Sequence, residues 1–258
     1  MVNRTYTKLA FGVLLTLPAW AGDSAVVVDR GLPQANLNNV SGPQRSNVRW
    51  GWQEEGFLGD SFSIGAPGET WVIDSIRTWV VPGNAAHAHR NLGDYYKDVR
   101  LYLGGQEDDL TPISTGLLSP NSDLASNANI AISEATREST LLYDDFGAFM
   151  RIWQVEFTNL NVTVDGGRQQ RFGVWGLGRN VEGTEDKTYT WYNHASNARL
   201  SVARQDNADG EMILFSGSGR AKGGFNAEGH GWDKPADINV QVIAHRLDSR
   251  LQRPAVRK

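Results

Sequence analysis

The chain has 258 residues, no cysteine and a formal net charge of −4 at pH 7. The acidic balance argues against nucleic acids and anionic membranes as main partners, because both attract a basic surface. The lack of cysteine excludes disulfides, thiol catalysis and cysteine-based metal sites.

The N-terminus has the three parts of a secretory signal peptide. Arg4 and Lys8 make a basic start, Leu9 to Leu17 is apolar, and Ala19-Trp20-Ala21 is a small-x-small cleavage site. The apolar run is too short to cross a bilayer, which takes about 20 residues. The sequence therefore predicts a signal peptide over residues 1–21, a secreted or periplasmic location and no membrane span. Removal of Arg4 and Lys8 makes the formal charge −6.

Short β-type runs separated by turn residues dominate the rest of the chain, which is typical of an all-β protein. The clearest run, TWVIDSIRTWVV at Thr70–Val81, alternates as a strand does, and its alternation slips at Asp74–Ser75. A β-bulge is expected there. Other strands are predicted at Ala25–Val28, Ser61–Ile64, Val99–Leu103, Met150–Leu160, Gln170–Trp175, Ser201–Arg204, Met212–Ser216 and Ile238–His245. A polar stretch at Ser122–Thr136 is predicted to be a loop with one turn.

No Pro/Ser-rich linker or repeat divides the chain, so one domain is expected. The prediction is a single jelly-roll-type β-sandwich domain over residues 22–247, followed by a basic flexible tail at 248–258.

Four segments carry a resemblance to a known group of proteins. They read GDSFSIGAPGETWVIDSIRTWVV, KDVRLYLGG, RQQRFGVWGLG and DINVQVIAHR. Together they resemble the strands of secreted bacterial β-sandwich modules of mostly unassigned role, which occur on cell-surface and extracellular proteins. The resemblance implies a jelly-roll fold whose core includes Phe62, Trp71, Ile73, Ile76 and Tyr102.

A second resemblance lies in VVPGNAAHAHRNLGD at Val80–Asp94. It is similar to the first cupin motif, in which a Pro-Gly turn precedes His-x-His and an acid follows. Alternate strand residues share a face, so His87, His89 and Asp94 could ligate a transition metal. The usual acid in that motif is Glu, however, and the second cupin motif has no counterpart here. The alternative is a polar loop that leads into the strand at Val99.

The same stretch allows an enzyme of another kind. Jelly-roll polysaccharide lyases, which this chain would resemble in fold, use a Tyr or His as base and an Arg or amide to neutralise the uronate. His87, His89, Arg90, Tyr95 and His194 supply these residue types. Their convergence in space is the condition for this hypothesis.

Aromatic residues beside amides and acids in the predicted loops indicate sugar recognition, because a pyranose stacks on a flat ring. The candidate ligand-binding residues are Tyr95, Tyr96, Trp191, Tyr192, His194, His230 and Trp232. For Trp191 and Trp232 the alternative is an ordinary place in the core or at its rim.

A calcium site is the one cofactor that the sequence suggests. In QDNADGE, the side chains of Asp206, Asn207, Asp209 and Glu211 carry the oxygens that Ca²⁺ prefers. A type I′ hairpin turn centred on Asp209-Gly210 explains the same residues without an ion, and this interpretation is favoured.

The leading hypothesis is a secreted, non-catalytic module that binds glycan or another extracellular polymer, or forms part of the cell surface or matrix. One alternative is a lyase-type or cupin-like metal-dependent enzyme centred on His87 and His89. Another is a matrix subunit that assembles with copies of itself.

Overall fold

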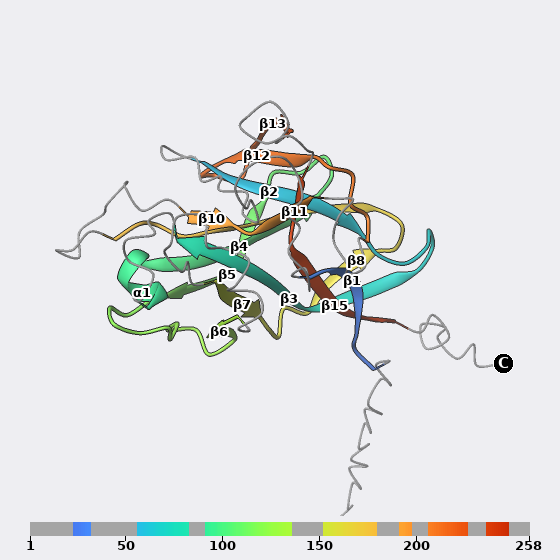
Figure 1. Ribbon diagram of the computed structural model, residues 1–258. Coiled ribbons are helices and arrows are strands. Elements are labelled where there is room, and N and C mark those ends of the chain that lie inside the picture. Colours follow the sequence, from blue (N-terminus) through green and yellow to red (C-terminus); the bar gives the residue numbers. More distant parts are fainter. Residues whose placement is uncertain are drawn as a thin grey trace, which may run out of the picture.

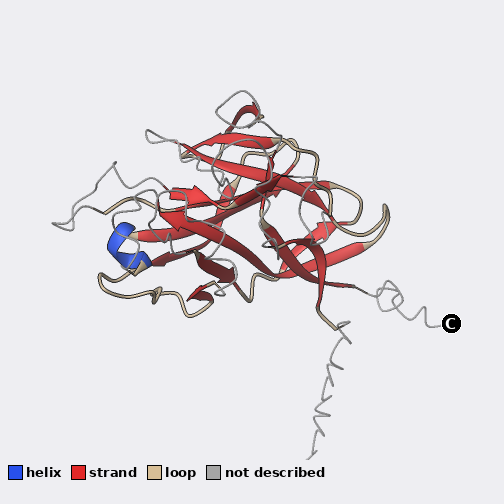
Figure 2. Cartoon of the chain, in the orientation of Figure 1, coloured by secondary structure: helices blue, strands red, loops and turns tan. Residues whose placement is uncertain are grey.

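The computed structural model describes residues 23–31, 56–82, 91–135, 152–179, 191–197, 206–226 and 236–247. These residues form two antiparallel sheets packed face to face (Figure 1), with strands predominating throughout (Figure 2). The prediction of an all-β sandwich is confirmed.

The first sheet, here called sheet A, is built around the long strand β3. Its strands, in spatial order, are β1 (Ala25–Arg30), β15 (Val240–Arg246), β3 (Thr70–Pro82), β7 (Trp153–Phe157) and β6 (Ile130–Glu134). Two short strands also pair with β3, namely β8 (Val162–Asp165) at its start and β10 (Trp191–Asn193) at its end. Along one edge of β3, β15 is therefore followed end to end by β10.

The second sheet, sheet B, faces sheet A across the core. Its strands, in spatial order, are β13 (Ala221–Phe225), β12 (Met212–Ser216), β2 (Gly56–Ser63), β9 (Gln169–Trp175), β4 (Asp98–Gly105) and β5 (Thr111–Leu117). Two further strands, β11 (Ala195–Asn197) and β14 (Ala236–Ile238), pair with each other outside both sheets. In the chain, β11 directly follows β10 and β14 directly precedes β15. A short helix, α1 (Leu92–Tyr95), precedes β4.

The predicted bulge in β3 is present. Ser75 pairs with Ile243 and Ile73 pairs with Ala244, so Asp74 is the extra residue. The bulge resets the alternation of the strand, and both Ile73 and Ile76 are fully buried on the core side.

The main core lies between the sheets, and its aromatic members include Phe62, Trp153, Phe157 and Phe172. Trp71 packs against this core from a partly buried position. A smaller cluster of Phe57, Tyr102, Leu110 and Phe215 is also buried. Phe57 and Leu58 are neighbours on β2, so their side chains point to opposite faces of the strand. Leu58 belongs to the main core, which places the smaller cluster on the other face of sheet B.

The sequence prediction missed helix α1 and strands β5, β8, β10, β11 and β13, and it assigned a further strand to a loop. The stretch Ser122–Thr136 was expected to be a loop, but Ile130–Glu134 forms the edge strand β6. Its residues pair in register with β7, from Ile130 opposite Phe157 to Glu134 opposite Trp153. This tertiary pairing overrides the weak local strand signal of an Ala-, Asn- and Ser-rich segment. The predicted strand at Ser201–Arg204 lies outside the described residues.

Candidate functional site

Several predicted site residues lie outside the part of the chain that the structure describes. They are His87, His89, Arg90, His230 and Trp232. The cupin-like and lyase-type hypotheses, which centre on His87 and His89, therefore stay predictions.

Three aromatic residues that were candidates for stacking on a sugar are core residues. Tyr95, Tyr96 and Trp191 are 1%, 0% and 2% exposed. The ring of Tyr96 lies 4.7 Å from that of Trp191, and the ring of Tyr95 lies 5.9 Å from that of Trp153. Burial raises the pKa of the Tyr96 hydroxyl well above its ordinary value. These rings offer no open face to a ligand, while Tyr192 is half-buried on β10.

Asp94, the third predicted transition-metal ligand, has a structural task. Its Oδ2 accepts a hydrogen bond from the backbone N–H of Asn91 at 2.9 Å, at the start of α1. Its Oδ1 accepts one from the backbone N–H of Asn121 at 2.6 Å. A carboxylate at the first turn of a helix commonly takes this role, because the first N–H groups lack partners within the helix.

His194 is fully buried at the point where β10 and β15 meet beside β3. Its backbone N–H donates to the carbonyl of Trp79, and its carbonyl accepts from the N–H of Asn239. Its Nδ1 lies 2.6 Å from the side-chain oxygen of Asn239. Burial lowers the pKa of His194 to about 4, so the ring is neutral at physiological pH. These contacts join the residue between β10 and β11 to β3 and to the residue between β14 and β15.

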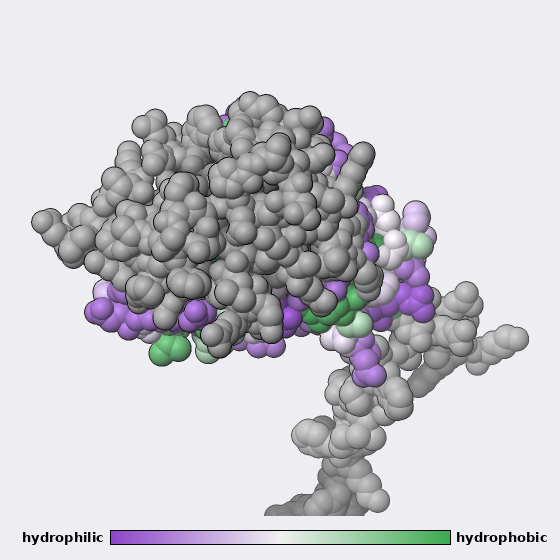
Figure 3. Space-filling model, in the orientation of Figure 1, coloured by the Kyte–Doolittle hydropathy of each residue, from purple (hydrophilic) through white to green (hydrophobic). Residues whose placement is uncertain are grey.

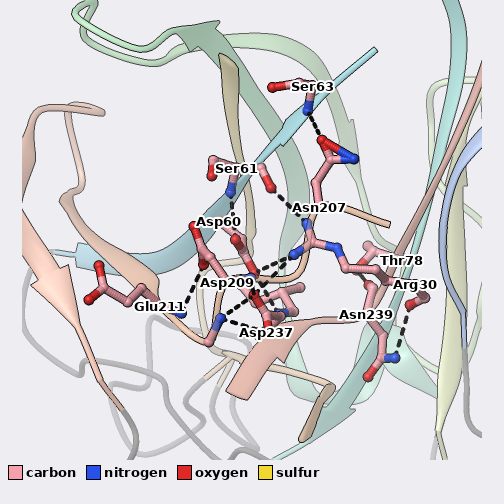
Figure 4. Close-up of polar contacts among 12 residues, drawn as sticks. Arg30, Asp60, Ser61, Ser63, Thr78, Asn207, Asp209, Glu211, Asp237 and Asn239 are labelled. Atoms are coloured by element: carbon pink, nitrogen blue, oxygen red, sulfur yellow. Dashed lines mark hydrogen bonds and ion pairs between the residues drawn. The ribbon is translucent and has the colours of Figure 1, made fainter. Parts of the chain in front are cut away.

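A buried charged cluster lies at the same corner of the sandwich. Arg30 follows Val28 on the inner face of β1, and Asp60 lies between Leu58 and Phe62 on the inner face of β2. The Arg30 Nη1 is 3.2 Å from Asp60 Oδ2 and 3.3 Å from Asp237 Oδ1 (Figure 4). All three side chains are at most 1% exposed.

The charge of this cluster does not balance, because two carboxylates face one guanidinium. Burial raises the pKa of Asp60 to about 7; Arg30 opposes this shift and the charge of Asp237 adds to it. Burial also raises the pKa of Asp237. The cluster therefore gains a proton near neutral pH, which leaves one ion pair in the core.

The segment Asp206–Glu211 is fastened to the cluster and to two strands. Asp206 accepts a hydrogen bond from the N–H of Asp29 on β1 at 3.0 Å, and Asn207 accepts one from Ser63 on β2 at 2.9 Å. Asp209 Oδ1 accepts one from the N–H of Glu211 at 2.9 Å. Three of the predicted calcium ligands thus have side-chain oxygens bound to backbone N–H groups.

The predicted type I′ turn is not formed. Such a turn needs a positive φ at both central residues, but the positive values fall on Asn207 (59°) and Gly210 (84°). The N–H groups of Asp209 and Gly210 instead donate to the Asp237 carboxylate at 3.0 and 3.1 Å (Figure 4). The buried acid fixes the loop conformation, a contact that the local sequence does not reveal.

Among the described residues, Asp60, Asp209 and Asp237 offer carboxylate oxygens within 4.8 Å of one another, as a divalent cation would need. Only Asp209 belongs to the predicted calcium ligands. The guanidinium of Arg30 already contacts Asp60 and Asp237 and supplies positive charge there. The calcium prediction itself stays untested.

A groove of about 780 Å³ lies at one end of the sandwich, where three strands of sheet B end beside β8 of sheet A. The turn between β4 and β5 and the turn between β8 and β9 flank it. Its lining residues are Ser63, Gly105, Gln106, Glu107, Asp108, Thr163, Val164, Asp165, Gly167, Arg168, Gln169 and Gln170.

Close backbone packing fixes the wall formed by the β8–β9 turn. The N–H of Gly166 donates to the carbonyl of Glu69, and the N–H of Gly167 donates to that of Ile64, both at 2.8 Å. Gly167 has a φ of 73°, and a side chain there would meet the ring of Pro67. Only glycine suits such a position, so this wall is built in advance of any ligand.

The groove lining carries amides and acids. The carboxamides of Gln106, Gln169 and Gln170 each combine an acceptor oxygen with an NH₂ donor. Gln170 is 8% exposed and is the second residue of β9. Sequence analysis missed these residues because each turn reads as an ordinary polar hairpin loop, and nothing local shows that the two turns meet.

The described part of the surface offers little apolar area. Its exposed large apolar side chains are Val26, Leu117 and Leu124. Where described residues are visible in Figure 3, they are mostly hydrophilic. No helix within the described ranges is long and apolar enough to cross a membrane.

Comparisons with known proteins give no relative from which a function could be inferred. No protein-family model, no characterised protein and no solved structure matches this chain. The structure defines the class as an all-β sandwich with two packed antiparallel sheets.

Proposed function

We propose that this chain is a secreted, non-catalytic β-sandwich module that binds a glycan in the groove between the β4–β5 and β8–β9 turns. The groove is the observation that carries the proposal. Its volume of about 780 Å³ falls within the range of roughly 300–1,000 Å³ of ligand sites. Secretion is supported by the signal-peptide pattern of residues 1–21.

The chemistry of the lining supports a sugar ligand. A hydroxyl both donates and accepts hydrogen bonds, so a chain of hydroxyls suits a surface of amides and carboxylates. Gln106 on the β4–β5 turn and Gln170 on β9 provide amides at two positions in the groove. The rigid β8–β9 turn lowers the entropy that ordering on binding would otherwise cost.

The placement of other polar groups supports binding over catalysis. The described members of the lyase-type set, Tyr95 and His194, are buried and do not line the groove. The buried acids Asp60 and Asp237 hold Arg30 and a loop. In this interpretation the buried polar side chains stabilise the fold, and the ligand binds in the groove at the end of the sandwich.

The test is a screen of the mature protein on a glycan array, followed by calorimetry with the glycans retained. The double variant Gln106→Ala/Gln170→Ala is expected to weaken binding by roughly tenfold or more, because it removes two polar contacts of about 1 kcal/mol each. Gln154→Ala is the matched control, since Gln154 lies on β7 outside the groove.

Two results would overturn the proposal. One is a mature protein that retains no glycan of any class. The other is binding that Gln106→Ala/Gln170→Ala leaves at wild-type strength while circular dichroism shows that the variant is folded.

A further inference from the structure

The charges around the groove carry an inference about ligand class, which rests on the proposed function. We infer that the groove selects neutral or amine-bearing glycans and rejects glycans that carry carboxylate or sulfate groups. Among the described residues, three acids and one base line it: Glu107, Asp108 and Asp165 against Arg168. The formal charge of this described lining is therefore −2.

The single positive charge is already paired. Arg168 Nη1 lies 3.4 Å from Asp165 Oδ2 on the same turn, and the two side chains are 76% and 63% exposed. Glu107 and Asp108 stand on the opposite wall, both exposed, and neither forms an ion pair within the described residues. The unbalanced negative charge is thus concentrated on the β4–β5 turn.

The geometry of that turn presents these two acids to the groove. Gly105 and Asp108 close the turn with a hydrogen bond from the Asp108 N–H to the Gly105 carbonyl at 3.2 Å. Gly105, Gln106, Glu107 and Asp108 all line the groove. A ligand there lies well within the screening length of about 8 Å at physiological ionic strength, so the carboxylates act on it directly.

The sign of the charge separates the classes of glycan. A uronate or sulfate would meet the carboxylates of Glu107 and Asp108, which disfavours binding. An amino-sugar chain would instead place an ammonium group beside each of these carboxylates, which favours binding. Exposed ion pairs change affinity by roughly twofold to fivefold each, so the two acids are expected to give a preference on the order of tenfold for amine-bearing over anionic chains.

The same array tests the inference, provided that it carries neutral, amine-bearing and anionic chains of matched length and linkage. Suitable soluble probes are β-1,4-linked oligomers of N-acetylglucosamine, glucosamine and glucuronate. The expected order of affinity is glucosamine, N-acetylglucosamine, then glucuronate. Added salt should weaken binding of the amine and leave binding of the neutral chain unchanged.

Variants isolate the role of the two acids. Glu107→Gln/Asp108→Asn is expected to bring the amine-to-uronate preference close to one while neutral binding persists. Asp23→Asn/Glu211→Gln removes the same total charge from two exposed acids outside the groove, and it should keep the preference.

The outcomes distinguish the two proposals. If no glycan of any class binds, the proposed function is wrong. If glycans bind but the anionic chain binds as tightly as the others, the inference is wrong and the proposed function stands. A preference that survives Glu107→Gln/Asp108→Asn would also overturn the inference.

Discussion

Replacement of Arg30 tests how the buried cluster stabilises the sandwich. Arg30→Met keeps an unbranched side chain of similar length and removes the charge that faces Asp60 and Asp237. It also removes the hydrogen bond from Nη2 to the carbonyl of Ser61, at 2.9 Å. Removal of one partner from a buried ion pair costs about 3–5 kcal/mol. This loss is a large part of the total stability of roughly 5–15 kcal/mol of a typical domain.

The loss is expected to depend on pH. Without Arg30, the influence that lowers the pKa of Asp60 disappears, and both buried acids are more easily protonated. In acid, where the carboxylates are neutral in the fold, Arg30→Met should therefore be milder than at about pH 8. Urea unfolding followed by tryptophan fluorescence measures the free energy of unfolding at both values.

Arg30→Lys is the control, because it keeps one positive charge near the two acids. It should destabilise the protein less than Arg30→Met does. A loss below about 1 kcal/mol for Arg30→Met at about pH 8, the size of an exposed pair, would refute the reasoning. If Arg30→Met lost more free energy of unfolding in acid than at about pH 8, the loss would not come from the charges of Asp60 and Asp237.

Three further predictions concern the stability of the sandwich. Asp60 has a folded-state pKa of about 7, above its ordinary value of 3.8, so its contribution to stability is full below the ordinary value and is lost as pH rises through about 7. The lowered pKa of His194 changes stability in the opposite direction over the same window. Unfolding curves of His194→Gln, which lacks that contribution, should therefore show falling stability between about pH 5 and 7, and a rising curve would contradict the shift. Gly173→Ala places a methyl group against the ring of Phe57 and should cost about 1–3 kcal/mol, whereas Gly224→Ala, whose nearest neighbour would be 3.7 Å away, should be close to neutral in the same melts. Added Ca²⁺ should leave the melting temperature unchanged, because Arg30 already supplies positive charge to the acids; a rise that Asp209→Asn abolishes would show a calcium site.

Part of the strand framework could be predicted because it depends on local alternation. The run Thr70–Val81 and its slip at Asp74–Ser75 correspond to β3 and its bulge. The edge strand β6 could not be predicted, since its pairing with β7 supplies what its own residues lack.

The aromatic residues show the limit of this reasoning for the site. Tyr95, Tyr96 and Trp191 stand among polar neighbours in the sequence, a pattern that surface loops and helix-to-strand corners share. Only the folded chain shows that their rings are buried. The groove is similar, because two hairpin turns about 60 residues apart in the chain meet through tertiary packing, which no short pattern encodes.

The buried cluster did have a signal in the sequence. Arg30 continues the face of Val28, and Asp60 stands between Leu58 and Phe62 on the apolar face of its strand. A charged residue in an apolar alternation indicates a buried charge with a partner, since an unpaired one would be too costly. The identity of the partner, Asp237, still required the structure.

The most direct test of the account is to locate the ligand on the protein. Backbone amide NMR shifts should be followed while the best-binding glycan from the array is titrated into the mature protein. The largest shifts are expected on Gln106–Asp108 and Gln169–Gln170, on the two sides of the groove. Shifts confined to residues outside the groove would contradict binding in the groove.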